Sequence, residues 1–343
     1  MKISKDTISE NSPVYIIAEA GVNHNGDIEI AKKLIDVASH AGANAVKFQT
    51  FIPELLSSVH AEKAEYQKKY DPDNNNQIEM LNKLSLPFED YYTLLDYAKD
   101  HNITFLSSPF DEKSLELLVE LEVDAIKIPS GELTNLWLLD EINKYGKPAI
   151  LSTGMSIPDE IEIALSHLKD INVALLHCVS SYPTPYNEVN LRAIHTLKEQ
   201  FRIPVGFSDH TNGIEISLAA VSLGANIIEK HFTLDKNMVG PDHKSSINPN
   251  ELNLMISSIR NIEECFGDGI KRVQPCEENV KAVARKSIVA KYDIKEGEKI
   301  SRNNLTAKRP GTGIPILNFN QIDGKIALRT IKKDELITKE MII

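Results

Sequence analysis

The chain contains 343 residues, of which 42% are hydrophobic and 25% are charged, and it carries a formal net charge of −11 at pH 7. This length fits one large domain and one small domain, and the acidic balance argues against binding to nucleic acid, which needs a dense basic surface. No apolar run reaches the roughly 20 residues that a membrane-spanning helix needs, so we expect no membrane partner.

Eight short apolar runs recur along the first two thirds of the chain, at residues 14–18, 44–48, 103–107, 125–128, 149–152, 173–177, 204–208 and 226–230. They lack alternating polarity, which is typical of parallel strands buried on both faces. The segments between most of them carry apolar residues at helical spacing, such as Ile28, Ala31 and Leu34. This alternation predicts an α/β fold, a (β/α)8 TIM barrel. The competing open sheet is disfavoured because Gly21 to Gly26 lacks the GxGxxG pattern of a dinucleotide site.

Capping residues mark several helix starts within this region. The sequence places Asn25-Gly26-Asp27 before one helix and Ser156-Ile157-Pro158 before another. A third start is indicated by Asn248 and Pro249 with Glu251.

The residue pattern changes after Gly267-Asp268-Gly269. A polar stretch follows, and after it come short predicted strands separated by glycine and proline. We therefore expect a barrel over residues 1–268, a linker over 269–282 and a small β-rich domain over 283–343. Within that domain, Asp293–Ser301 is echoed by Thr330–Thr338, which predicts two similar turns.

Three cysteines, Cys178, Cys265 and Cys276, lack CxxC spacing and suit neither a disulfide framework nor a zinc cluster. The polar N-terminus contains no apolar export signal. We expect a cytoplasmic protein.

Two lysines lie at the ends of predicted strands, where barrel enzymes build their active sites. Lys47 and Lys127, expected on neighbouring strands, are accompanied by serine and threonine hydroxyls in the same positions of other strands. A solvated lysine is the ordinary alternative for either one alone. Together they favour a pocket for a phosphorylated or carboxylated anion.

Two histidines follow the seventh and eighth predicted strands. His210 and His231 should lie side by side at one rim, where they can bind a divalent metal, with Asp209 or Glu229 orienting the rings. His177 lies inside its run and is predicted to be structural. Glu19 and Glu132 follow the first and fourth strands and are candidates for sugar or acid–base carboxylates, with a salt bridge to a rim lysine as the alternative.

Segments along the whole chain resemble the sialic acid synthase family. In order they are AEAGVNHNG (18–26), VKFQT (46–50), SSPFD (107–111), IKIPSGE (126–132), LSTGM (151–155), HCVSSYPTP (177–185), GFSDHT (206–211), EKHFT (229–233), GPDH (240–243), ARKSIVA (284–290) and KRPGTGI (308–314). The order and spacing of the motifs make the resemblance specific. It implies a TIM barrel followed by an SAF, or antifreeze-like, domain.

The resemblance also implies an activity: condensation of phosphoenolpyruvate with an N-acetylated amino sugar, releasing phosphate. The implied phosphoenolpyruvate ligands are Lys47, Ser108, Lys127, Ser130, Ser152 and Ser208. The implied metal ligands, for Mn²⁺ or Mg²⁺, are His210 and His231. The implied sugar ligands are Glu19, Glu132, Tyr182, Asp242 and Arg309, the last reaching into the partner's barrel in a domain-swapped homodimer. The implied catalytic residues are Glu19, Glu132, His210 and His231.

The chain departs from the family pattern at Ser180, where some members carry asparagine. Other members use another asparagine to bind the sugar, and its counterpart here is one of Asn74, Asn75 and Asn76, among which the sequence does not discriminate.

Several functions stay open at this point. N-acetylneuraminate synthase, using N-acetylmannosamine, is the first reading. The alternative is N,N'-diacetyllegionaminate or another nonulosonate synthase, whose 2,4-diacetamido-6-deoxy acceptor differs at carbons 4 and 6 and would be sensed near residues 52–80 and 133–137. A non-catalytic, antifreeze-like binding protein is disfavoured by the reactive residues in the barrel.

Overall fold

Eight parallel strands form a ring, and each coincides with one of the predicted apolar runs. They are β3 (Tyr15–Gly21), β4 (Ala45–Thr50), β5 (Thr104–Pro109), β6 (Ile126–Ile128), β7 (Ala149–Ser152), β8 (Val173–Cys178), β9 (Val205–Asp209) and β10 (Ile227–His231). The first and last of them, β3 and β10, pair in parallel with Ile16 opposite Ile228. The ladder runs β5-β4-β3-β10-β9-β8-β7-β6, and the contact of β5 with β6 closes the ring. The predicted TIM barrel is confirmed.

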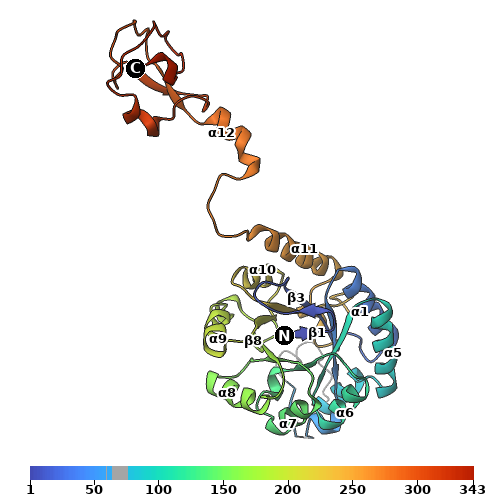
Figure 1. Cartoon of the computed structure of the whole chain (residues 1–343). Coiled ribbons are helices and arrows are strands. Elements are labelled where there is room, and N and C mark those ends of the chain that lie inside the picture. Colours follow the sequence, from blue (N-terminus) through green and yellow to red (C-terminus); the bar gives the residue numbers. More distant parts are fainter. Residues whose placement is uncertain (59, 64–75) are drawn as a thin grey trace. The chain divides into compact units, whose positions relative to one another are not determined.

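This computed structural model describes residues 1–58, 60–63 and 76–343. Helices surround the strands (Figure 1): α1 (Ile28–His40), α2 (Pro53–Leu56), α4 (Gln77–Leu84), α5 (Phe88–Asp100), α6 (Glu112–Glu120), α7 (Leu136–Tyr145), α8 (Pro158–His167), α9 (Ala193–Phe201), α10 (Glu215–Ser222) and α11 (Pro249–Cys265). Helix α1 illustrates why these helices pack on the strands: one apolar stripe, which includes Ala31, Leu34 and Ile35, is buried in the barrel core. Within the described part of the chain, no helix is long and apolar enough to cross a membrane.

The capping residues act largely as expected. Asp27 accepts from the first amides of α1, and Asn248 and Glu251 form a reciprocal capping box on α11. At α8 the cap is different: the Glu160 carboxylate accepts from the amide of Ile157 at 2.9 Å. Ser156 instead donates to the Gly154 carbonyl, so it does not cap this helix.

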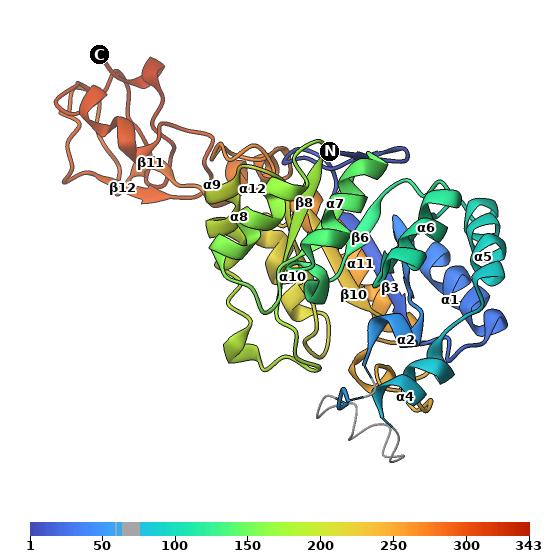
Figure 2. The ribbon, with the colours of Figure 1, turned by 90° about the horizontal axis from the view of Figure 1, so that it is seen from below.

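One end of the barrel is closed by the N-terminus. The hairpin of β1 (Lys2–Ile3) and β2 (Asp6–Thr7) inserts Ile3 into a buried cluster with Ile8, Tyr15 and Ile17. In Figure 2 this hairpin lies at the end of the barrel opposite α2 and α4. The carboxyl ends of the strands therefore form the open mouth.

The chain divides into two compact units, residues 1–266 and 267–343. The second unit contains α12 (Glu278–Ala284) and the antiparallel strands β11 (Ser287–Ala290) and β12 (Leu305–Lys308) around its own apolar core. The two echoed segments meet there, because Ile294 and Ile331 exchange backbone hydrogen bonds at 2.8 Å. Their turns share a left-handed residue at the matching positions, Gly297 and Asp334.

Candidate active site

A cavity of about 430 Å³ opens at the carboxyl ends of the barrel strands. Most of the residues predicted to act together line it. They are Glu19, Lys47, Ser108, Lys127, Ser130, Ser152, Tyr182, Ser208, His210, His231 and Asp242. Strand register explains part of this convergence, since Glu19 on β3 lies opposite Lys47 on β4 and opposite His231 on β10.

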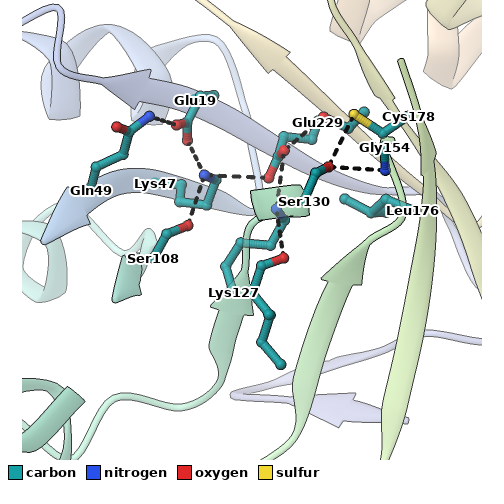
Figure 3. Close-up of polar contacts among 12 residues, drawn as sticks. Glu19, Lys47, Gln49, Ser108, Lys127, Ser130, Gly154, Leu176, Cys178 and Glu229 are labelled. Carbon is teal, nitrogen blue, oxygen red and sulfur yellow. Dashed lines mark hydrogen bonds and ion pairs between the residues drawn. The ribbon is translucent and has the colours of Figure 1, made fainter. Parts of the chain in front are cut away.

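A buried group of two lysines and two glutamates forms the floor of the cavity (Figure 3). Lys47 Nζ lies 2.8 Å from Glu19 Oε2 and 3.7 Å from Glu229 Oε2. Lys127 Nζ lies 3.5 Å from Glu229 Oε1. The two lysines are on β4 and β6 with β5 between them, so the expectation of neighbouring strands is wrong. They converge because side chains of alternate strands share one layer inside a barrel.

Burial and charge act in opposite directions within this group. Burial raises the pKa of Glu19, and the Lys47 ammonium offsets only part of that effect. Glu229 is buried as well, yet the charges of Lys127 and Lys47 hold its pKa below the ordinary value. Burial lowers the pKa of Lys127, with Glu229 opposing it. The group therefore keeps Glu229 ionised and lets Glu19 take up a proton more readily than an exposed glutamate.

Hydroxyl and amide donors surround the lysines. Lys47 Nζ donates to Ser108 Oγ at 3.2 Å, and Ser208 Oγ donates to Glu229 Oε1 at 2.9 Å. Ser130 Oγ accepts from the Gly154 amide at 3.0 Å (Figure 3). The buried Ser152 Oγ has no hydrogen-bond partner among the described residues. A buried hydroxyl without a partner is costly, so this site fits an anion that accepts hydrogen bonds.

The two histidines lie side by side, with ring centroids 5.5 Å apart. His210 Nδ1 lies 2.9 Å from the Val179 carbonyl, so in the neutral ring it donates there and leaves Nε2 with a free lone pair. Tyr182 packs on His210 with ring centroids 4.1 Å apart. The two carboxylates expected to orient these rings have other partners in the described structure. Asp209 pairs with Lys230 and accepts from Thr211, and Glu229 pairs with Lys47 and Lys127.

A divalent cation fits this pair, although as an incomplete site. Among the described residues no three histidine, cysteine, aspartate or glutamate side chains are grouped as metal ligands. In the same part of the chain, the buried His231 Nδ1 has no hydrogen-bond partner, and it lies 3.9 Å from Asp242 Oδ2. Burial keeps the pKa of His231 well below its usual value, so the ring stays neutral, the form that binds metals. Two imidazole ligands would leave several coordination positions of the cation to water and substrate.

Other predicted residues lie elsewhere. Glu132 does not line the cavity; it follows β6 in a short 3-10 turn and accepts from Asn135 Nδ2 at 2.7 Å. Arg309 belongs to the second unit, where it is exposed and donates to the Ala284 carbonyl. His177 lies outside the cavity lining with Nε2 2.7 Å from the Val189 carbonyl, in line with a structural role. Ser180 lines the cavity.

Of the three candidate asparagines, Asn74 and Asn75 lie outside the described residues. Asn76 caps α4, where its side chain accepts from the Glu79 amide.

The cavity also contains residues that the sequence did not single out as ligands. The sequence indicated Glu229 only as a partner for the histidines. It did not indicate Gln49 as a ligand, although Gln49 donates to Glu19 Oε1 at 3.3 Å. The larger omission is an apolar side, built by Val22, Phe51, Leu56, Met80, Leu81, Leu84 and Phe110. Apolar residues in loops carry no chemical signature, so only the structure could show that they face the site.

Comparison with known proteins covers both units of the chain. The NeuB family matches residues 34–271, and the SAF domain matches residues 285–343. The chain is 52% identical to an N,N'-diacetyllegionaminic acid synthase of Campylobacter jejuni, over 94% of this chain and 98% of the relative. It is 44% identical to the enzyme of the same description from Legionella pneumophila, over 90% of this chain and 89% of the relative.

Among solved structures, the N-acetylneuraminic acid synthetase of Leptospira borgpetersenii, in complex with citrate, is similar with a TM-score of 0.72 and 36% identity, covering 82% of this chain and 94% of that chain. This chain therefore shares the fold of that structure, and the NeuB and SAF matches agree with its division into two units.

Proposed function

The chain belongs to the NeuB family, and on that premise we propose that it is an N,N'-diacetyllegionaminic acid synthase, which condenses phosphoenolpyruvate with 2,4-diacetamido-6-deoxymannose. The observation that carries the proposal is the buried floor of the cavity, where two lysines and several hydroxyls offer a site to one small anion. The relatives named for this product are 52% and 44% identical, whereas the sialic acid synthetase structure is 36% identical.

In this proposal phosphoenolpyruvate binds over the floor of the cavity. Lys47 and Lys127 hold its phosphate and carboxylate, and Ser108, Ser130, Ser152 and Ser208 donate hydrogen bonds. These fixed donors stabilise the charge that moves onto the departing phosphate. The condensation joins C3 of phosphoenolpyruvate to the aldehyde carbon of the sugar, adds a water oxygen at C2 and breaks the bond from C2 to the phosphate oxygen.

The acceptor sugar would lie above this anion, between Glu19, Tyr182 and Asp242. Burial raises the pKa of Asp242 to about 6, with His210 opposing the shift. Glu19 and Asp242 can therefore exchange protons near neutral pH, as acid–base groups require. Glu132 retains a proposed role in sugar binding from the resemblance, although a change of conformation would be needed to bring its carboxylate to the cavity.

We propose that His210 and His231 hold Mn²⁺ or Mg²⁺. When bound, a divalent cation supplies Lewis-acid polarisation of the sugar aldehyde. His231 would contribute a neutral nitrogen. Burial opposes a charge on His210, but the neighbouring Cys178 raises the pKa of that ring above its ordinary value, so metal binding through its Nε2 would require loss of a proton. The Val179 carbonyl fixes the tautomer of the neutral ring.

Further parts of the proposal concern the whole protein. We propose a cytoplasmic enzyme with a barrel at residues 1–268, a linker at 269–282 and an SAF domain at 283–343. A domain-swapped homodimer would bring Arg309 to the partner's sugar. Support comes from exposed apolar side chains on both units: Trp137 on the barrel is 82% exposed, and Leu317 in the second unit is 95% exposed.

Phosphate release tests the reaction and the acceptor together. The purified protein is assayed with phosphoenolpyruvate and Mn²⁺ and with each sugar in turn. We expect the highest kcat/KM with 2,4-diacetamido-6-deoxymannose, and loss of turnover on chelation that Mn²⁺ restores. Higher kcat/KM with N-acetylmannosamine would instead establish the second candidate, N-acetylneuraminate synthase, which the 36% identical synthetase favours. Turnover of neither sugar would contradict the proposal.

A further inference from the structure

We propose that an apolar wall on one side of the cavity selects the acceptor, by favouring sugars with a methyl group at carbon 6 and an acetamido group at carbon 4. This inference rests on the proposed function. The apolar wall consists of Val22, Phe51, Leu56, Met80, Leu81, Leu84 and Phe110. Its members follow β3, β4 and β5 or belong to α2 and α4, whereas the histidine pair belongs to the ends of β9 and β10.

The apolar wall is a hydrophobic cluster separate from the barrel core. Val22, Phe51, Met80 and Leu84 are buried together, with Leu56 and Phe110 packed against them. Phe51 meets Phe110 edge to face, with ring centroids 6.3 Å apart. The wall therefore offers a continuous hydrocarbon surface, in contrast to the charged floor made by Lys47, Lys127 and their carboxylates.

Several contacts hold the apolar wall in place without a ligand. The Tyr91 hydroxyl donates to the Gln49 carbonyl at 2.7 Å, and the Ile52 amide donates to Asp111 Oδ2 at 2.9 Å, on either side of Phe51. At the other end Gly26 approaches α4 so closely that a Cβ there would lie 2.8 Å from the Lys83 carbonyl oxygen. A wall fixed in advance discriminates between ligands better than one that adapts.

The two candidate acceptors differ in how they would meet this surface. A methyl group against hydrocarbon gains free energy from leaving water, whereas a hydroxyl there gives up water without a partner. A polar residue at the edge of the wall, Gln77, suits an acetamido group. Ser57 donates to Gln77 Oε1 at 2.7 Å, which directs the amide nitrogen of Gln77 to other acceptors such as an acetamido carbonyl.

The other segment expected to sense the acceptor does not reach the cavity. Leu133 is buried in the barrel core, and Asn135 caps α7 while donating to Glu132. Trp137 is exposed to solvent. None of residues 133–137 lines the cavity, so within the described chain the structure assigns acceptor selection to the segment around α2 and α4.

Helix α2 provides a matched pair of variants, because Leu56 lines the cavity while its neighbour Leu55 is 56% exposed. Leu56→Gln and Met80→Gln add a hydrogen-bonding group to the apolar wall, and Leu55→Gln makes the same change outside it. The measurement is kcat/KM for 2,4-diacetamido-6-deoxymannose divided by kcat/KM for N-acetylmannosamine. We expect this ratio to fall by about 10-fold or more in both wall variants, within the range known for one apolar group, and to stay unchanged in Leu55→Gln.

Two outcomes would contradict the inference, and they are distinguishable. If the parent enzyme prefers N-acetylmannosamine, the proposed acceptor fails and the inference fails with it. If the parent prefers the diacetamido sugar but Leu56→Gln and Met80→Gln keep its ratio, the apolar wall does not select. The KM for phosphoenolpyruvate, expected to be unchanged, and the thermal midpoint separate local effects from loss of folding; should Met80→Gln not fold, the less buried Leu56→Gln decides.

Discussion

At the scale of single residues, the barrel interior tolerates ionisable groups only where a second group compensates them. Lys47 and Lys127 stay buried because Glu19 and Glu229 lie within ion-pair distance. An unpaired ammonium in such a place would be costly. Binding of a di- or trianion at the same lysines adds negative charge beside Glu19 and Glu229. Lys47 and Lys127 can then exchange their ion pairs with these carboxylates for ion pairs with the anion.

His24 is a buried ionisable residue outside this group, and it makes stability depend on pH. Its Nδ1 accepts from the Gly26 amide at 3.1 Å, and its buried Nε2 has no hydrogen-bond partner among the described residues. Burial lowers the pKa of His24 to about 4, with Asp27 opposing the shift. Because the unfolded chain binds a proton below about pH 6.5, the folded state should lose about 3 kcal/mol between pH 6.5 and pH 4.

The prediction is tested with His24→Gln, which keeps an acceptor for the Gly26 amide. Urea unfolding at several pH values between 4 and 7.5 gives the free energy of unfolding. We expect the parent to lose more of it than the variant as the pH falls through this window. His195→Gln, at an exposed side chain, should follow the parent. Equal slopes in His24→Gln and the parent would show that the protonation of His24 does not contribute to the pH dependence.

The chemical part of the site could be predicted because polar residues at strand ends stand out against apolar runs. Lys47, Lys127, His210 and His231 all line the cavity as their positions indicated. Glu132 shows the limit: it closely follows a strand end, yet a hydrogen bond from Asn135 holds its carboxylate away from the cavity. Rotation of a side chain is decided by local partners, which strand periodicity does not reveal.

At the scale of elements, the eight strands were predictable and the short helices of the apolar wall were not. Each strand is a continuous buried run, visible in the sequence without reference to its neighbours. Helix α2 spans only Pro53–Leu56 and buries little, so it has no helical period to detect. Its position depends on contacts between loops that follow different strands, which is a tertiary effect.

Gly26 makes one of those contacts, and replacing it should disturb α4. Gly26→Ala would strain a residue at φ +73° and place a Cβ 2.8 Å from the backbone oxygen of Lys83. Because a backbone carbonyl cannot move aside alone, we expect a loss of about 1–3 kcal/mol beyond the backbone strain and a raised KM for the acceptor sugar. Urea unfolding and steady-state kinetics give the two quantities.

Gly267→Ala is the matched control, since Gly267 has φ +61° but a Cβ added there would meet no atom within 4 Å. It reports the cost of left-handed backbone alone. If the two alanine variants lose equal stability and leave the acceptor KM unchanged, the approach of Gly26 to α4 does not position the wall.

At the scale of the whole molecule, the two units have separate cores, and the second is small. The core of residues 267–343 is built from one apolar cluster that includes Ile288, Ile294 and Ile331. So small a unit gains stability from a partner surface. The repeated turns were visible in the sequence, but the exposure of apolar residues such as Leu317 was not, because exposure depends on the folded structure.

A mixed dimer tests whether Arg309 acts on the partner's site. Arg309→Ala removes the guanidinium proposed to contact the sugar, and Lys127→Ala removes a lysine proposed to bind phosphoenolpyruvate. Each variant alone should therefore have little activity. In a swapped dimer of the two, one site combines an intact barrel with an intact Arg309 from the other chain. We therefore expect heterodimers, purified through a different tag on each chain, to recover about half of the parental kcat, because one of two sites is complete.

The control for this experiment pairs Arg309→Ala with the double variant Arg309→Ala, Lys127→Ala. Both chains of this dimer lack the Arg309 side chain, so no activity should return. Arg309 is exposed in its own unit, so its truncation should leave the thermal midpoint close to that of the parent. If the first heterodimer is as inactive as the control, Arg309 serves the barrel of its own chain. Full activity of Arg309→Ala alone would show that Arg309 serves no barrel. Recovery in the first pair and not in the second can arise only by contribution of Arg309 across the dimer.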